Sequence, residues 1–148
     1  MNNIPPKNFR RPYPLPFKNG IEDSLDLSTV GLGTYLGAPN DEDDFDTYIT
    51  AKHLLMSKTV NVIDTAINYR CMKAERILGQ VLNTVINQEK TINRDEVFIS
   101  TKAGYMPDDG DNGIPASVLI EELIEKELIT TEDIAGGIHC MHPSFLEH

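Results

Sequence analysis

Residues 60–66 read Val-Asn-Val-Ile-Asp-Thr-Ala, and this stretch decides the fold. Its first four residues are rich in β-branched side chains and predict a short strand that gives way abruptly to a polar loop. Further along the chain the spacing of the apolar residues changes, and they recur at i, i+1, i+4, i+5, i+8 and i+9. This spacing predicts a helix whose apolar face is wide enough to cover a sheet. The residues that carry it are Ile77, Leu78, Val81, Leu82, Val85 and Ile86.

The same alternation continues on both sides of this unit. Residues 29–35 predict an earlier strand and residues 97–100 a later one, and a loop rich in Asp and Gly follows at 106–113. Strands that alternate with helices are typical of a parallel sheet with covering helices, so the predicted class is α/β. A further helix is predicted from apolar residues at helical spacing: Leu119, Ile120, Leu123, Ile124 and Leu128.

Four consecutive acidic residues, 41–44, predict the start of the helix that follows the first strand. They supply an N-cap and an acidic first turn that complements the helix dipole. We interpret them as a solvated helix start and not as a calcium loop, because the alternating ligand spacing and the distant Glu of an EF-hand are missing. The buried face of this helix is predicted to carry Phe45, Tyr48, Ile49, Leu55 and Met56.

The two ends of the chain have local chemistry of their own. Five prolines within residues 1–18 predict an extended arm, and Asn19-Gly20 predicts a tight hairpin turn between residues 15–17 and 21–27. Residues 134–138 are too rich in glycine to predict a strand, whereas Pro143 suits the first turn of a helix. Only three βα units precede that helix start, so we expect the sequence to stop inside a domain that begins at residue 19.

Composition excludes several classes of function. The 148 residues contain 13 Lys and Arg against 23 Asp and Glu, a net charge of -10, which disfavours nucleic acid and anionic membranes as partners. The two cysteines fit no short-spaced ligand pattern, so we expect neither structural zinc nor another metal, and no disulfide scaffold. No signal-peptide or membrane-spanning run is present, and the predicted location is the cytoplasm.

Two charged residues stand where βα architecture places working groups. Asp64 follows the second strand and Lys102 the third, so neighbouring parallel strands would bring them together at the carboxyl edge of the sheet. A buried ion pair that only closes this edge explains the spacing equally well. Tyr69, in the loop after Asp64, favours the functional interpretation, because an adjacent ammonium lowers the pKa of a phenol from about 10 and makes it a usable proton donor.

Four ordered blocks of this sequence resemble the aldo-keto reductase family. They cover roughly residues 27–107 and comprise G-L-G-T-Y-L-G at 31–37, I-D-T-A-I-N-Y at 63–69, E-R-I-L-G at 75–79 and F-I-S-T-K at 98–102. The resemblance implies a (β/α)₈ barrel, of which this chain would supply about the first three units, with the hairpin closing its bottom. It also implies reversible reduction of aldehydes or ketones to alcohols with a nicotinamide cofactor.

The family's roles transfer to matching positions. Tyr69 would protonate the carbonyl oxygen, Lys102 would ease the loss of that proton, and Asp64 would hold the ammonium in place. Gly33, Thr34, Tyr35 and again Asp64 would lie at the cofactor. NADPH is expected in preference to NADH, and the partner is expected to be a small carbonyl or alcohol substrate.

The family's catalytic histidine has no good match. His139 follows a poor strand and His142 directly precedes a proline, so we interpret both as loop or cap residues and expect the catalytic histidine beyond residue 148. Two alternatives to an incomplete reductase remain open. One is a non-catalytic regulatory or interaction module on the same scaffold, and the other is a self-contained three-unit module with a structural Asp64–Lys102 pair.

Overall fold

A three-stranded parallel sheet organises the molecule. The computed structural model describes residues 10–14 and 24–147, and its sheet has the order β3 (Leu32–Gly33), β4 (Val62–Asp64), β5 (Phe98–Ser100). Gly33 lies opposite Asp64 and Asp64 opposite Ser100, so all three strands end at the same level. The predicted α/β class is confirmed. The strand predicted at 29–35 is limited to two residues, and over the described part of the chain the sheet remains open, with β3 and β5 at its edges.

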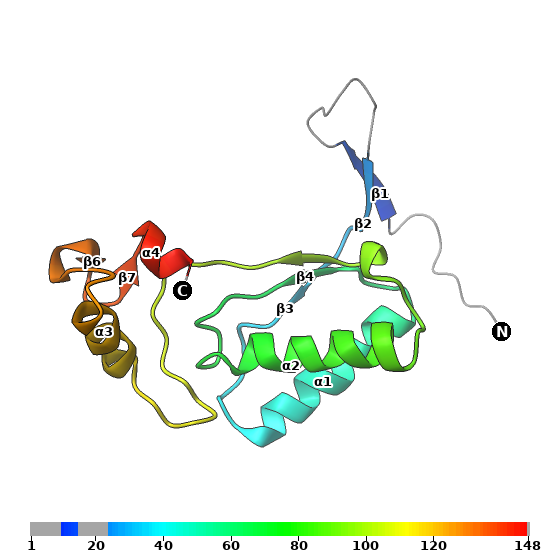
Figure 1. Ribbon diagram of the computed structural model, residues 1–148. Helices are drawn as coiled ribbons and strands as arrows, with labels where there is room; N and C mark the ends of the chain where they lie inside the picture. Colours follow the sequence, from blue (N-terminus) through cyan, green and yellow to red (C-terminus); the bar gives the residue numbers. More distant parts are fainter. Residues whose placement is uncertain (1–9, 15–23, 148) are drawn as a thin grey trace.

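Two crossover connections between the parallel strands place helices on one face of this sheet. Figure 1 shows α1 (Asp41–Met56) and α2 (Lys73–Leu82) side by side along it, and α2 continues as the π-helical η2 (Asn83–Gln88) before the short η3 (Arg94–Glu96). The predicted second helix is confirmed, because its stripe forms the centre of the core. The buried core residues are Ala51, Leu55, Ile63, Leu78, Val81, Val85, Ile92 and Val97.

The predicted buried face of α1 is wrong in large part. Phe45, Ile49 and Met56 are exposed. The prediction holds for Leu55, which is buried, and for Tyr48, which packs against the core, and Ala51 is buried as well. The helix turns Asp44 inward as well, because this carboxylate has cationic partners on α2 and in the loop before it. Hydrophobic spacing could not reveal this, since it assigns a carboxylate to the solvent side.

The amino-terminal segment forms a strand pair. β1 (Arg10–Pro14) pairs antiparallel with β2 (Ser24–Ser28), so part of the predicted arm is a strand, and Pro12 is tolerated because a two-stranded ribbon has only edge strands. The predicted Asn19-Gly20 turn lies outside the described residues. Ser28 and Asn61 exchange hydrogen bonds of 2.7 and 3.0 Å, which fix the ribbon to the amino ends of the sheet strands.

A second, smaller unit follows β5. It contains α3 (Ala116–Glu125), η4 (Thr131–Asp133), β6 (Ile134–Ala135), β7 (His139–Cys140) and α4 (Pro143–Leu146). Its own core consists of Met106, Leu123, Ile129 and Cys140. The helix predicted from Leu119, Ile120, Leu123 and Ile124 is confirmed as α3, which ends before Leu128. The helix predicted to start at Pro143 is confirmed as α4.

The hairpin of β6 and β7 is not predicted by the sequence pattern. Gly136 and Gly137 have φ of 59° and 75°, the two left-handed residues that a type I′ turn requires, so the glycines that argued against a strand are the turn of a hairpin. No helix in the described ranges is long and apolar enough to cross a membrane.

Candidate active site at the carboxyl edge of the sheet

Asp64 and Lys102 meet at the carboxyl edge of the sheet, as their spacing predicts. Asp64 is the last residue of β4, and Lys102 follows β5 by two residues. The Lys102 Nζ lies 2.9 Å from each carboxylate oxygen of Asp64 and 2.9 Å from the backbone oxygen of Thr65. The side chains of Lys102 and Asp64 are 50% and 48% exposed. The pair is therefore not buried, as it would be if it only closed this edge of the sheet.

Tyr69 joins this pair from the β4–α2 loop. Its hydroxyl lies 3.4 Å from Asp64 Oδ2, a long contact, and the Lys102 Nζ lies 4.6 Å from the centre of its ring. The interaction with the Tyr69 hydroxyl, followed by that with Asp64, raises the pKa of Lys102 above its ordinary value against a smaller desolvation effect. The group is therefore a phenol and a carboxylate held around a fixed ammonium charge.

The residues predicted for the cofactor divide into a buried and an exposed part. Thr34 is buried, and its hydroxyl is 2.9 Å from Thr65 Oγ1 and 3.2 Å from the Asp64 carbonyl oxygen, so it braces the backbone of the site. Tyr35 is 66% exposed and its ring meets Tyr69 edge-on, with centroids 5.1 Å apart. Gly33 faces open space, because a Cβ added there would meet nothing within 4 Å.

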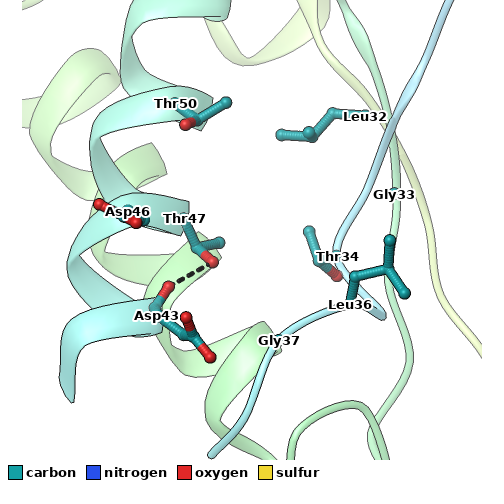
Figure 2. A pocket seen from close by; sticks show the side chains of 9 residues that line it. All are labelled: Leu32, Gly33, Thr34, Leu36, Gly37, Asp43, Asp46, Thr47 and Thr50. Atoms are coloured by element: carbon teal, nitrogen blue, oxygen red, sulfur yellow. Dashed lines mark hydrogen bonds between the residues drawn. The ribbon is translucent and has the colours of Figure 1, made fainter. Parts of the chain in front are cut away.

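A cavity of about 250 Å³ lies between β3 and α1, and Figure 2 shows the side chains around it. Gly33 and Thr34 form part of its sheet side, and Asp43 and Asp46 belong to its helix side. Two carboxylates disfavour the phosphate groups of a dinucleotide there. Among the residues predicted for the cofactor, Tyr35 is exposed and Asp64 is about half exposed, so these two side chains present surface to a ligand.

A second cavity of about 610 Å³ adjoins the site, because Lys102 belongs to its lining. Lys102 and Thr101 lie at its edge, and most of its remaining wall is apolar, contributed by residues such as Met72, Leu119 and Phe145. An apolar recess beside a polar group is the usual form of a small-molecule site. The β4–α2 loop, the segment after β5, α3 and α4 all contribute to it.

A network of charged side chains that sequence analysis missed supports the loop of Tyr69. Lys73 Nζ lies 2.7 Å from both Asp44 and Asp111, and Arg76 binds Asp109 through two nitrogens at 2.7 and 2.8 Å. Hydrogen bonds from Arg76 and then Asn112 lower the pKa of Asp109, and those from Lys73 and then Arg76 lower the pKa of Asp111. The only signal in the sequence was opposite charge on segments far apart, which does not specify partners.

The two carboxyl-terminal histidines have structural contacts. His142 caps α4, because its Nδ1 accepts a hydrogen bond of 3.3 Å from the Ser144 backbone nitrogen. The ring of His139 stands edge-on to Tyr105 with centroids 5.0 Å apart. The predicted cap role is confirmed for His142.

One comparison with known proteins gives a match. The model of the Aldo/keto reductase family matches residues 29–128, which include β3, β4, β5 and every residue of the candidate site. Comparison with curated proteins finds no match, and comparison with solved structures finds none either.

Proposed function

The chain belongs to the aldo/keto reductase family, and we propose that it is built to reduce an aldehyde or ketone reversibly to an alcohol with NAD(P)H. The observation that carries the proposal is the group formed by Asp64, Tyr69 and Lys102. A phenol, a carboxylate and an ammonium converge at the carboxyl edge of a parallel sheet, where ligands of such folds bind.

Each member of this group has a proposed role in proton transfer. The Tyr69 hydroxyl donates its proton to the carbonyl oxygen, and the Lys102 ammonium, 4.6 Å from the ring, stabilises the phenolate that remains. Asp64 holds that ammonium in place, because Lys102 Nζ donates to both of its carboxylate oxygens at 2.9 Å. The bound nicotinamide would supply the hydride for the carbonyl carbon.

We propose that Tyr35 and Asp64 contact the nicotinamide end of the cofactor, while Thr34 and Gly33 shape the backbone beside it. Their exposure supports this division, because Tyr35 and Asp64 present surface and the Thr34 hydroxyl is already bonded within the protein. NADPH is proposed in preference to NADH, on the family resemblance alone.

We propose that residues 19–148 are the amino-terminal portion of a (β/α)₈ barrel and that residues 1–18 are an arm whose strand β1 pairs with β2. The parallel order β3-β4-β5 with two open edges supports this, since a barrel continues its sheet on both sides of any three strands. The proposed substrate is a small carbonyl compound that enters the apolar 610 Å³ cavity beside Lys102.

The test is titration of NADPH, and separately of NADH, into the chain while nicotinamide fluorescence and turnover of an aryl aldehyde are measured. We expect an incomplete barrel to bind the cofactor weakly at most, and NADPH more tightly than NADH. Any turnover should fall about 10²- to 10⁴-fold in Tyr69→Phe, the usual contribution of a general acid. Lys102→Met should lower it similarly without abolishing binding.

Tyr48→Phe is the matched control, because its hydroxyl bonds Thr84 at 3.0 Å in the helical layer. Turnover that Tyr69→Phe leaves unchanged would contradict the proposed proton donor, whereas a folded chain that binds no cofactor would mean that these residues are an incomplete piece of a reductase. Saturable binding with no turnover would instead favour a non-catalytic, cofactor-sensing module on this scaffold.

A further inference from the structure

The backbone directly after Tyr69 adopts an uncommon conformation. Arg70, Cys71 and Met72 have φ of 53°, 54° and 70°, and none of them is glycine. A left-handed conformation costs a side-chain-bearing residue about 1 kcal/mol or more, so three in succession persist only where surrounding contacts impose them. The contacts of this loop therefore determine where the Tyr69 ring lies.

Arg70 makes the largest share of these contacts, and its side chain is only 1% exposed. Its Nε donates to the Ala38 carbonyl oxygen at 3.1 Å, its Nη1 donates to Thr47 Oγ1 at 2.9 Å, and its Nη2 donates to the Asp44 carboxylate. A planar guanidinium can satisfy three directions at once, which a lysine ammonium on a flexible stem does less well. The side chain thus ties the loop of Tyr69 to the start of α1.

A second segment holds the same loop from its other side. The Gly110 backbone nitrogen donates to the Cys71 carbonyl oxygen at 2.9 Å, and a Cβ added to Gly110 would lie 3.0 Å from the Cys71 Cβ. Lys73, just beyond the loop, binds Asp44 as well, so the carboxylate that anchors Arg70 also anchors the first turn of α2. Contacts from α1 and from residues 109–111 therefore enclose the left-handed turn.

We propose that Arg70 is a positioning residue that holds the Tyr69 hydroxyl at the Asp64–Lys102 pair by imposing the left-handed turn that follows Tyr69. The inference rests on the proposed function for its chemical meaning, since Tyr69 is the proposed proton donor. The claim that Arg70 fixes the position of the Tyr69 ring can be tested independently of that function. Without the three anchored nitrogens the turn can relax, and the ring then leaves its place between Tyr35 and Lys102.

The experiment is nuclear Overhauser spectroscopy on the isotope-labelled 148-residue chain, with Tyr69 signals assigned by comparison with Tyr69→Phe. Arg70→Lys keeps the charge beside Asp44 and removes the fork. We expect it to retain the cross-peaks of the core between α1 and α2, and to lose those that join the Tyr69 ring to Lys102 and Tyr35.

Arg94→Lys is the matched control, because Arg94 also donates to a backbone oxygen, that of Val97 at 2.7 Å, and belongs to η3. It should retain all the Tyr69 cross-peaks. Should Arg70→Lys fail to fold, Thr47→Val removes one of the three anchors and leaves both charges in place, and the Tyr69 cross-peaks should weaken.

Retention of the Tyr69 cross-peaks at full intensity in folded Arg70→Lys, or in Thr47→Val where that variant replaces it, would overturn the inference. In the turnover assay we expect Arg70→Lys to lower kcat about 10- to 100-fold while KM changes by less than about twofold, as misplacement of a reacting group does. The cross-peaks need neither cofactor nor substrate, so a failure of the proposed function, seen with Tyr69→Phe, is distinguishable from a failure of the positioning role.

Discussion

Lys102 illustrates how a charged residue can be fully bonded and still accessible. Its ammonium has three oxygen partners at 2.9 Å, yet half of its side chain is exposed. Exposed ion pairs contribute little to stability, because water solvates both charges almost as well when they separate. The pair therefore adds little to folding, and the role proposed above for Lys102 beside Tyr69 would account for its geometry.

Lys102→Met should leave the urea midpoint of unfolding close to that of the unsubstituted chain, since the exposed pair adds little. Denaturation followed by circular dichroism measures this. Lys52→Met is the control, because Lys52 pairs with Glu89 on the helical layer and is also partly exposed. A clear fall in the midpoint confined to Lys102→Met would assign the Asp64–Lys102 pair a structural role.

At the scale of elements, α1 is held in place by a carboxylate as much as by its apolar residues. Asp44 is 8% exposed and binds both Arg70 and Lys73. The side chains of Phe45 and Ile49 are exposed and therefore contribute little to the packing of α1. A buried charge is tolerated only when it is paired, so the loss of one partner leaves the others uncompensated.

Asp44→Asn should therefore lower the free energy of unfolding by about 3–5 kcal/mol, the usual cost of breaking a buried pair. Asp41→Asn is the comparison, because the Asp41 side chain is fully exposed and its contact with Lys73 is long, at 3.8 Å. We expect this substitution to change the free energy of unfolding by no more than about 0.5 kcal/mol. Urea denaturation of both variants measures the difference. Equal effects would show that the Asp44 network is not what fixes α1.

Acid should weaken the connection between α2 and residues 109–111. The pKa values of Asp109 and Asp111 are lowered in the folded chain by Arg76 and Lys73, so both are ionised in the native state and bind protons more readily once unfolded. Their stabilisation is present above the unfolded pKa of about 3.9 and is lost as pH falls through the lower folded values.

We expect stability to fall below about pH 4 and to continue falling to the lowest pH tested. Urea midpoints measured at a series of pH values should decline less steeply below pH 4 in Arg76→Met, which lacks one shared partner of Asp109 and Asp111. Parallel declines in the two proteins would exclude this network as the cause.

At the scale of the whole molecule, the candidate site is bordered by two parts of the chain, each with a hydrophobic core of its own. One lies between the sheet and the helices α1 and α2, and the other lies within the unit formed by α3, β6, β7 and α4. The segment after β5 joins them and supplies Lys102, while the 610 Å³ cavity is shared between them. Units with separate cores can open separately.

Leu123→Ala should test this separation, because Leu123 is fully buried in the second core. Such truncations cost about 2–5 kcal/mol, and we expect amide protection to fall in residues 103–147 while β4 and β5 keep theirs. Hydrogen exchange measured by mass spectrometry distinguishes the regions. Val81→Ala, in the first core, is the control and should lower protection in β4 and β5. Uniform loss in Leu123→Ala would show a single cooperative unit.

Much of the fold could be predicted because the signals are local. The stripe from Ile77 to Ile86 and the β-branched runs before Asp64 and Lys102 are confirmed as α2 with its extension, β4 and β5. The hairpin of β6 and β7 could not be predicted from local signals, because its strands have only two residues each. A Gly-Gly pair without recognisable strands beside it is typical of a loop.

The sequence by itself determined the order of strands and helices and the placement of Asp64 and Lys102 at one edge, because periodicity and strand ends are properties of neighbouring residues. Only the tertiary structure decided which face of α1 is buried and that Arg70 anchors the loop of Tyr69. Asp44 and Arg70 are 26 positions apart, and Arg76 and Asp109 are 33 apart. Partners at such separations are chosen by how the backbone brings charges together, which no local pattern encodes.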